Sequence, residues 1–297
     1  MRILVSGVHG QIGYELARSM LPLGEVVGLS RSGMDLSDAD RIREVVRTVA
    51  PDLVVNAGAY TAVDKAESEA GRKEALAINV RALEVLAEET RRLGIPVVHY
   101  SSDYVYDGRG SAPFRESDPT APLGVYGMTK RDGDLALMAG NPRHLILRVS
   151  WVVGAHGQNF ARTMLRLGRE RDRLAVVADQ VGVPTPAPFI ADLTAQLAAR
   201  MQRQDPDGFA YGLYNAVPAG ETSWFDYARF VLQEARSSGV DLRVQPEDIE
   251  PLATADYPTA AARPLNSRLD TTRLRAVFGV HLPDWRIPLS QVLRWLW

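Results

Sequence analysis

The amino-acid sequence predicts an α/β fold built on a doubly wound parallel sheet, with a smaller lobe towards the C-terminal end. Apolar strand-like runs alternate with amphipathic helical runs through the first half of the chain. Continuous Val, Ile and Leu runs separated by helices are typical of a parallel sheet covered on both faces. A glycine-rich turn directly follows the first of these runs, which is the arrangement of a Rossmann-type dinucleotide-binding fold.

The expected elements of the first half follow one another in a regular order. Strands are expected over residues 2–6, 25–30, 52–56, 96–101 and 144–149. Helices are expected from residue 14 to about 21 and over 37–49, 72–93 and 126–139. Because each loop considered below follows a strand, these loops should meet at one edge of the sheet, where ligands of such folds bind.

The alternation weakens from about residue 151, which indicates a second part of the chain. A proline-rich stretch at 184–188 precedes an expected helix over 189–203, a strand over 211–217, and a helix over 222–237 with Thr222 as its N-cap. We therefore expect a dinucleotide-binding domain over residues 1–150. Residues 151–297 should form mainly a substrate-binding lobe, with some segments returning to the first domain.

The composition argues against several classes of protein. The 297-residue chain has no cysteine and therefore no disulfides, so the cytoplasm is the expected location. Its net charge of −2 and pI near 6.2 argue against a nucleic-acid-binding protein, which usually has a basic excess. Neither a signal peptide nor an apolar run of the ~20 residues that a membrane span needs is expected. The histidines lack the spacing of a zinc site.

Three glycines mark the expected cofactor site. Gly7, Gly10 and Gly13 are spaced G-x-x-G-x-x-G between the first strand and the first helix. Gly7 permits a tight turn, Gly10 lets the backbone approach a pyrophosphate, and Gly13 lets the helix pack closely on the strand. The helix N-terminus offers free N–H groups and the positive end of its dipole to that pyrophosphate. The sequence thus predicts a dinucleotide cofactor at this turn.

The end of the second strand bears on which nicotinamide cofactor is bound. An acidic residue there would accept hydrogen bonds from a ribose and favour NAD. Here Ser30 and Arg31 occupy the position instead. A hydroxyl and a guanidinium suit a 2′-phosphate, so we expect NADPH. NADH is the alternative if Arg31 is an ordinary solvated loop residue.

Tyr126 and Lys130 stand four residues apart in an expected helix, so their side chains share one face. Because a nearby cation favours an ionised phenol, we expect Lys130 to lower the pKa of Tyr126. Ser102 ends the fourth strand, where its hydroxyl can hydrogen-bond a substrate carbonyl beside Tyr126. These three residues form a candidate set for proton transfer to a carbonyl oxygen, with the hydride supplied by a nicotinamide.

Motifs along nearly the whole chain resemble those of the dTDP-4-dehydrorhamnose reductase family, which are extended short-chain dehydrogenases/reductases. They include G-V-H-G-Q-I-G from residue 7, N-A-G-A-Y-T-A-V-D-K-A-E from 56, H-Y-S-S-D-Y-V-Y-D-G from 99, V-Y-G-M-T-K from 125 and A-R-P-L-N-S-R-L-D from 262. The resemblance implies reduction of the C4 ketone of dTDP-4-dehydro-L-rhamnose to dTDP-L-rhamnose with NADPH or NADH.

The resemblance also implies roles for individual residues. Ser102 polarises the ketone, Tyr126 protonates its oxygen, and Lys130 holds the cofactor ribose. The other residues implied to contact the cofactor are Gly10, Gln11, Ile12, Asp35, Leu36, Ala59, Tyr60 and Thr61. The residues implied to face the sugar nucleotide, besides Ser102 and Tyr126, are Asp103, Trp151, Arg263 and Asn266.

Magnesium is the one family feature that we do not carry over. Some members form a magnesium-linked dimer through acidic residues on two helices. This chain keeps Glu15 on its first helix but has Pro188 at the matching place in the second segment. Because a proline side chain cannot ligate a metal, we expect no metal site. Whether the chain forms a homodimer is left open.

Three functions stay open at this point. The first is the reduction described above. The second is a sister reductase that gives the other C4 configuration or uses another 4-ketosugar nucleotide, since the same residues would serve it. The third is a non-catalytic regulatory subunit on this fold, like the subunit that binds methionine adenosyltransferase. Among single residues, His99 is interpreted as a core histidine, and Asp64 and Glu67 as capping or positioning groups.

Overall fold

A six-stranded parallel sheet forms the centre of the computed structural model, which describes residues 1–205 and 208–297. Neighbouring strands pair in parallel in the order β10-β5-β4-β3-β1-β2. This confirms the predicted fold class, and the five predicted strands of the first half end within one residue of their expected bounds. The strands are β1 (Arg2–Ser6), β2 (Glu25–Leu29), β3 (Leu53–Asn56), β4 (Val97–Ser102), β5 (His144–Val149) and β10 (Gly212–Asn215).

The sheet reverses its strand order at β1, which lies between β2 and β3. Along β1, Ile3 and Val5 enter the core on one face of the sheet, whereas Leu4 enters the core on the other face. All three are fully buried, because helices cover both faces. The loops that follow β1, β3 and β4 leave the same edge of the sheet, and this edge at a reversal of strand order is where such folds bind ligands.

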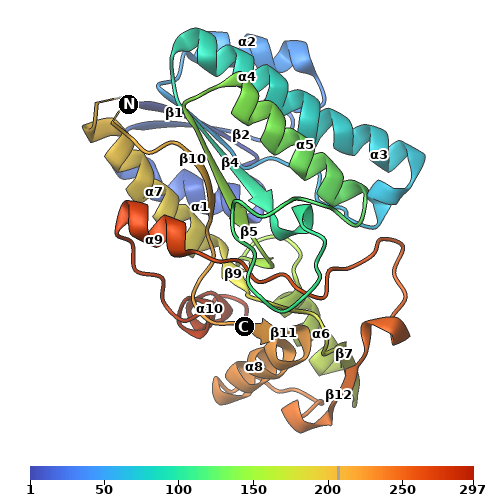
Figure 1. Ribbon diagram of the computed structural model, residues 1–297. Helices are drawn as coiled ribbons and strands as arrows, with labels where there is room; N and C mark the ends of the chain where they lie inside the picture. Colours follow the sequence, from blue (N-terminus) through green and yellow to red (C-terminus); the bar gives the residue numbers. More distant parts are fainter. Residues whose placement is uncertain (206–207) are drawn as a thin grey trace.

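Figure 1 shows the helices in two layers around the sheet. On one face, α1 (Gln11–Ser19) packs against α7 (Ala187–Arg203). On the other face, α2 (Ala39–Val49) packs against α4 (Ala82–Leu93), and α4 packs against α5 (Val125–Gly140).

The second half of the chain contributes to both parts of the molecule. From it, α7 covers one face of the sheet, β10 extends the sheet beside β5, and α9 (Thr272–Phe278) packs on β10. The other helices of this half, α6 (Phe160–Glu170), α8 (Trp224–Ser237) and α10 (Arg286–Leu293), share a separate apolar core. The domain boundary at residue 150 stays a prediction, since the chain passes between the two parts more than once.

Three short strand pairs link the segments of this smaller lobe. The pairs are β6 (Val152–Val153) with β9 (Thr185–Pro186), β7 (Leu174–Val177) with β12 (Ile249–Leu252), and β8 (Val181–Gly182) with β11 (Thr222–Ser223). The predicted cap of α8 was wrong by one residue. Ser223 Oγ, not Thr222, accepts the N–H of Asp226 at 3.0 Å, because Thr222 lies within β11.

The helix expected over residues 72–93 is interrupted in the structure. It consists of α3 (Glu69–Leu76), a π-helical turn (Ala77–Arg81) and α4. Such π-turns are rare and occur frequently at functional sites. Asn79 lies in this turn, and its fully buried side chain points to the loop after β3, as described below.

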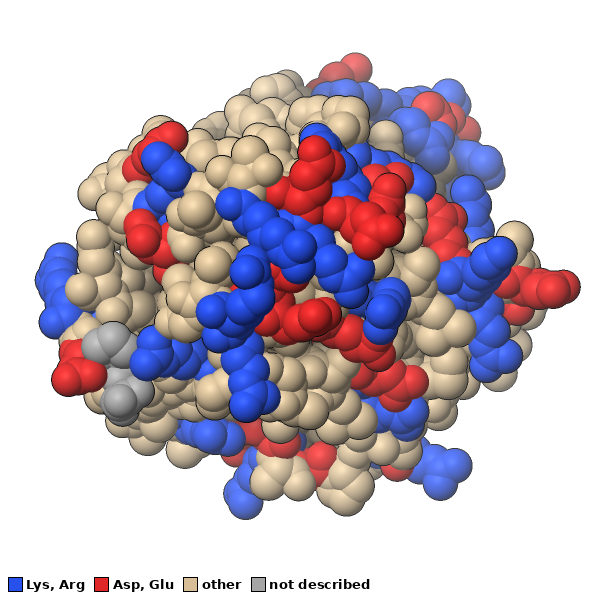
Figure 2. Space-filling model, turned by 90° about the horizontal axis from the view of Figure 1, so that it is seen from above, with Lys and Arg blue, Asp and Glu red and all other residues tan. Residues whose placement is uncertain are grey.

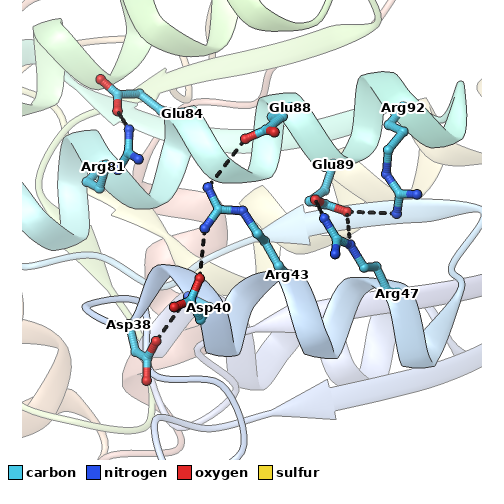
Figure 3. Close-up of polar contacts among 9 residues, drawn as sticks. All are labelled: Asp38, Asp40, Arg43, Arg47, Arg81, Glu84, Glu88, Glu89 and Arg92. Atoms are coloured by element: carbon cyan, nitrogen blue, oxygen red, sulfur yellow. Dashed lines mark hydrogen bonds and ion pairs between the residues drawn. The ribbon is translucent and has the colours of Figure 1, made fainter.

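A network of ion pairs joins α2 to α4 on the outer surface of the sheet domain. Figure 2 shows this side of the molecule, where basic and acidic side chains lie interspersed. Glu89 on α4 is fully buried and accepts two hydrogen bonds from Arg47 on α2 and one from Arg92 (Figure 3). These hydrogen bonds, from Arg47 first, lower the pKa of the Glu89 carboxyl. Glu89 therefore links the two helices as a buried anion.

Glu89→Gln should lower the free energy of unfolding at neutral pH by about 1 kcal/mol, because a carboxamide keeps the shape but not the charge. The figure is modest because the side chain of Arg47 is 52% exposed. Since the folded-state pKa is lowered, the stabilisation is present above the ordinary pKa of 4.5 and is lost as the pH falls through the folded-state value. Urea unfolding of both proteins at several pH values measures the difference.

Glu84→Gln is the matched control for this measurement. Glu84 pairs with Arg81 of the π-helical turn directly before α4, but both side chains are exposed, at 44% and 61%. Its replacement should change the stability by less than ~0.5 kcal/mol. Equal losses of unfolding free energy in the two variants would contradict the view that burial of Glu89 makes its ion pairs stabilising.

None of the described helices is both long enough and apolar enough to cross a membrane.

Candidate active site

The glycine-rich turn brings three backbone segments into close contact. Gly7 has a φ of +71°, and a Cβ at this position would lie 2.7 Å from Gly58 Cα in the turn after β3. A Cβ on Gly13 would lie 2.1 Å from the carbonyl oxygen of Gly7. Only glycine fits at these positions. The predicted roles of Gly7 in the turn and of Gly13 in close helix packing agree with this geometry.

The N-terminus of α1 is left open towards this turn. Gly10 is the N-cap of the helix, and it supplies no capping side chain. The first N–H groups of α1 are therefore available to an anion, and the positive end of the helix dipole lies behind them. A side chain at Gly10 would crowd the carbonyl oxygen of Gly7, 3.2 Å from the added Cβ. This cradle fits the pyrophosphate of a dinucleotide.

A cleft of about 600 Å³ opens at this edge of the sheet. Its lining includes ten of the residues predicted to bind the cofactor: Gly7, Gly10, Gln11, Ile12, Ser30, Arg31, Asp35, Leu36, Ala59 and Thr61. Other predicted residues, Gly13, Tyr60, Tyr126 and Lys130, do not line it. The prediction missed His9, Met34, Ala57, Gly58, Ile78, Val152, Gly157 and Gln158. The loop of the last three comes from the second half, so strand order alone could not place it.

Arg31 stands at the mouth of the cleft between two carboxylates. Its Nε lies 3.3 Å from Asp35 Oδ2 and its Nη1 lies 3.4 Å from Glu74 Oε1. Hydrogen bonds from Ser37, and then from Arg31, lower the pKa of the Asp35 carboxyl. The guanidinium remains 68% exposed, so it can still receive a phosphate from solvent.

Gln11 ties the glycine-rich turn to the smaller lobe. Its Oε1 accepts the N–H of Gly154 at 2.8 Å and an amide N–H of Asn159 at 3.0 Å. Beside it, the rings of Tyr14 and His156 lie 3.5 Å apart. The loop after β6 is thereby held against the cleft that it helps to line.

Asn79 fixes the loop after β3. Its Oδ1 accepts the N–H of Tyr60 at 2.9 Å, and its amide nitrogen donates to the carbonyl of Tyr60 at 3.1 Å. The same nitrogen lies 3.1 Å from Thr129 Oγ1 on α5. Tyr60 thus supports the cleft through its backbone, and the π-helical turn connects this loop to the helix that carries Tyr126.

Ser102 and Tyr126 form the centre of the second part of the site. Ser102 is buried at the end of β4, and its hydroxyl lies next to that of Tyr126. Burial of the phenol hydroxyl raises the pKa of Tyr126 to about 12, and the neighbouring hydroxyl of Ser102 offsets only part of this effect. The expectation that Lys130 lowers this pKa was therefore wrong for the protein as it stands.

Lys130 points elsewhere for a clear reason. Its Nζ donates to the carbonyl oxygen of Tyr100 at 2.7 Å and lies 3.0 Å from His99 Nε2. Both partners belong to β4, so the buried amine is held against the strand instead of the phenol. Burial lowers the pKa of Lys130 to about 8, and the negative charge of Asp134 acts in the opposite direction.

Asp103 lies beside Ser102 with one carboxylate oxygen unsatisfied. Its Oδ1 accepts from Ser102 Oγ at 3.1 Å. Oδ2 is buried with no partner among the described residues. Burial raises the pKa of Asp103 to about 6. A buried oxygen without a partner next to Ser102 is suited to accept a hydrogen bond from a hydroxyl of a bound sugar.

The other predicted substrate residues lie in the second half of the chain, and each is already in contact with other side chains or backbone. Trp151 has a left-handed φ of 45° and stacks on Trp224, with the ring centroids 3.8 Å apart. Arg263 pairs with Asp64, which also accepts the N–H of Ala261 at 3.0 Å.

Asn266 is buried and donates to the carbonyl of Ala112 at 2.8 Å. Its Oδ1 accepts from Arg268, so the amide of Asn266 is already engaged in holding its own loops.

Glu67 caps the helix that carries Tyr126. The N-cap of α5 is Gly124, which has no capping side chain, and Glu67 Oε1 accepts the N–H of Val125 at 2.8 Å instead. A Cβ on Gly124 would lie 2.6 Å from that oxygen, so glycine leaves room for it. The capping interpretation of Glu67 is thus confirmed. Asp64 holds Arg263 and the chain near Ala261 in place, which is a positioning role and not one in acid/base catalysis.

Neither Glu15 nor Pro188 belongs to a metal cluster. Glu15 accepts from Arg18, which also pairs with Asp192 on α7. Over the described part of the chain, no group of three or more His, Asp or Glu residues is arranged to hold a metal ion.

Glu67→Ala should destabilise the protein by about 1 kcal/mol, the usual value of a lost helix cap. Because Tyr126 follows Val125 directly, the same change should lower any turnover that depends on the phenol. Glu67→Gln is the control, since its amide oxygen can still accept the N–H of Val125. Thermal unfolding of the three proteins tests this, and equal melting temperatures for Glu67→Ala and the parent would refute the capping role.

Comparison with known proteins places this geometry in context. The model of a family described as the RmlD substrate binding domain matches residues 1–296. The dTDP-4-dehydrorhamnose reductase of Escherichia coli (strain K12) is 45% identical over 297 residues, which cover 99% of this chain and 97% of that protein. The similarity extends over both the cofactor cleft and the smaller lobe.

Solved structures agree with the sequence comparison. The dTDP-4-dehydrorhamnose reductase of Bacillus anthracis str. Ames, crystallised in complex with NADP, superposes with a TM-score of 0.89 at 28% identity, covering 99% of this chain and 98% of that one. The orthologue from Clostridium acetobutylicum ATCC 824 gives a TM-score of 0.89 at 31% identity and covers 100% of this chain and 99% of the other.

Proposed function

The chain belongs to the RmlD substrate binding domain family, and we propose that it reduces the C4 ketone of dTDP-4-dehydro-L-rhamnose to give dTDP-L-rhamnose. It is an oxidoreductase that uses NADPH. The observation that carries the proposal is the placement of Ser102 at the end of β4 next to Tyr126 and Lys130 on α5, at the sheet edge that also holds the dinucleotide cleft.

The residues of the cleft divide the binding of NADPH among them. The free N–H groups at the start of α1 receive the pyrophosphate, and Ser30 and Arg31 receive the 2′-phosphate. Lys130, which lies outside the lining of the cleft, would bind the ribose next to the nicotinamide. When bound, NADPH supplies the hydride to the sugar.

The proton comes from Tyr126. With a pKa of about 12, its hydroxyl keeps its proton at neutral pH, so it is ready to donate to an oxygen that becomes negative. Ser102 donates a second hydrogen bond to the same ketone oxygen, and Asp103 accepts from a hydroxyl of the sugar. Trp151 and Arg263 contact the sugar nucleotide farther out, while Asn266 holds the loops beneath it.

Purified protein with enzymatically generated dTDP-4-dehydro-L-rhamnose and NADPH tests the proposal. Loss of NADPH absorbance together with an NMR spectrum of dTDP-L-rhamnose is the expected result. The other C4 epimer as product would make this protein a sister reductase. Absence of turnover with NADPH still bound would favour a regulatory subunit.

Tyr126→Phe should lower kcat by about a hundredfold or more, because the proton donor is lost while the shape of the site survives. Tight binding of NADPH by the variant, measured through its fluorescence, shows that the site is intact. A variant with parental kcat would remove Tyr126 from the proton-transfer role.

Arg31→Ala should lower the ratio of kcat/KM for NADPH to that for NADH by about tenfold, the value of one hydrogen bond to a charged group. Steady-state kinetics with both cofactors measures the ratio. Arg43→Ala serves as the control, because Arg43 lies on α2 in the ion-pair network away from the cleft. An unchanged ratio in Arg31→Ala would exclude a phosphate-binding role.

The location and assembly of the enzyme belong to the same proposal. We propose that it acts in the cytoplasm, which agrees with a chain that contains no cysteine. We propose further that a homodimer, if the chain forms one, contains no magnesium, since a proline at position 188 cannot ligate the metal. Light scattering of the purified protein, with and without a chelator, tests the second point.

A further inference from the structure

His99 is a fully buried titratable residue for which the proposed reaction has no use. Its imidazole lies between two polar side chains: Nε2 is 3.0 Å from Lys130 Nζ, and Nδ1 is 3.1 Å from the amide nitrogen of Asn56. The interpretation of His99 as an ordinary core histidine therefore omits its contact with the lysine of the site.

The contacts continue as a row to the cofactor cleft. Ser6 Oγ donates to Asn56 Oδ1 at 2.5 Å and accepts the N–H of Gly58, which lines the cleft, at 3.4 Å. Ser6, Asn56 and His99 stand directly opposite one another on β1, β3 and β4. The register of three strands thus connects Lys130 to the wall of the cleft through buried side chains.

The donors and acceptors on the two sides of the His99 ring admit two arrangements. With the Asn56 amide as it stands, its nitrogen donates to His99 Nδ1, so the proton of the neutral ring is on Nε2. That N–H has Lys130 Nζ as its acceptor, which must then be a neutral amine with a lone pair.

A half-turn of the Asn56 amide gives the second arrangement. The amide oxygen then accepts from His99 Nδ1–H, and the amide nitrogen donates to Ser6 Oγ. His99 Nε2 now accepts from the ammonium of Lys130, which has only donors to offer. Both arrangements give each ring nitrogen of His99 a partner of the opposite kind, and they differ in the tautomer of His99 and in the charge of Lys130.

The charges around Lys130 bring both arrangements within reach near neutral pH. Burial lowers the pKa of Lys130 to about 8 and holds the pKa of His99 well below its usual range, so the ring stays neutral in both. Asp134 on the same helix raises the pKa of Lys130 and is itself paired with Arg148 of β5 at 3.2 Å. Tyr126, also on α5, keeps its proton and adds no charge.

We propose that His99 is a positioning residue that acts through Lys130: it exchanges tautomers, together with a turn of the Asn56 amide, whenever the lysine gains or loses a proton. The amine then keeps its place on β4 in either charge state. This inference rests on the proposed function only in giving Lys130 a catalytic task; the coupling itself is a property of the folded protein.

NMR of isotope-labelled imidazole nitrogens tests the coupling without any turnover. The signals of His99 are identified by their loss in His99→Gln. As the pH rises through about 8, the shifts of Nδ1 and Nε2 should interchange between the protonated and unprotonated type, with no imidazolium stage. One unchanged tautomer on both sides of this pH, or a protonated ring, would overturn the proposal.

The pH dependence of kcat/KM gives a second readout. Activity that needs the charged lysine falls as the pH rises through its pKa. Loss of the acceptor in His99→Leu should move this fall in activity to lower pH by about one unit.

Asn56→Asp fixes the proton on Nδ1 and adds a negative charge, so the fall in activity should move to higher pH. His99→Gln keeps an acceptor for the ammonium and should recover most of the activity.

His144→Gln is the matched control. His144 is half-buried at the start of the neighbouring strand β5, and its Nδ1 lies 2.6 Å from the carbonyl oxygen of Asn141, away from Lys130. Its pH profile should equal that of the parent. Identical profiles in all variants, with changes confined to melting temperature, would reduce His99 to a structural role. If the parent protein shows no turnover, the proposed function fails, while the NMR result still decides the coupling.

Discussion

The close approach of three backbone segments at the first turn is the constraint on which the rest of the structure depends. Gly7, Gly13 and Gly58 meet without side chains, so β1, α1 and the turn after β3 come closer than other residues would allow. That contact leaves the N-terminus of α1 open to the cleft, and the register of the strands behind it sets Ser6, Asn56 and His99 opposite one another. The row from Ser6 to Lys130 exists because this register is fixed.

Long-range polar contacts then attach later segments of the chain to this framework. Gln11 holds the loop after β6, Asp64 holds the segment around Arg263, and Glu67 caps the helix of Tyr126. Each contact joins residues that lie more than fifty positions apart in the sequence. The site is thus assembled by side chains of the first half that reach across to later segments, and the proton donor is placed by one of them.

Local patterns predicted the sheet and the glycine turn, because strand alternation and glycine spacing act within a few residues, whereas most of the predicted cleft residues came from the family resemblance. The predicted lowering of the pKa of Tyr126 was wrong, because Lys130 donates to the backbone of β4 and not to the phenol that helical spacing places near it. The π-helical turn at Asn79 depends on contacts with Tyr60 and α5 that no periodicity reports. The N-cap of α8 is Ser223 and not Thr222 because β11 pairs with β8, a long-range contact that the local sequence does not show.

In its proposed role, Arg31 must exchange its contacts with carboxylates for a contact with the cofactor phosphate. It is already paired with Asp35 and Glu74, so a phosphate must compete with carboxylates instead of meeting an isolated cation. Selectivity is then the difference between two pairings, smaller than the strength of either. In evolutionary terms, a change of Asp35 or Glu74 would retune the choice between the two nicotinamide cofactors while the arginine itself stays in place.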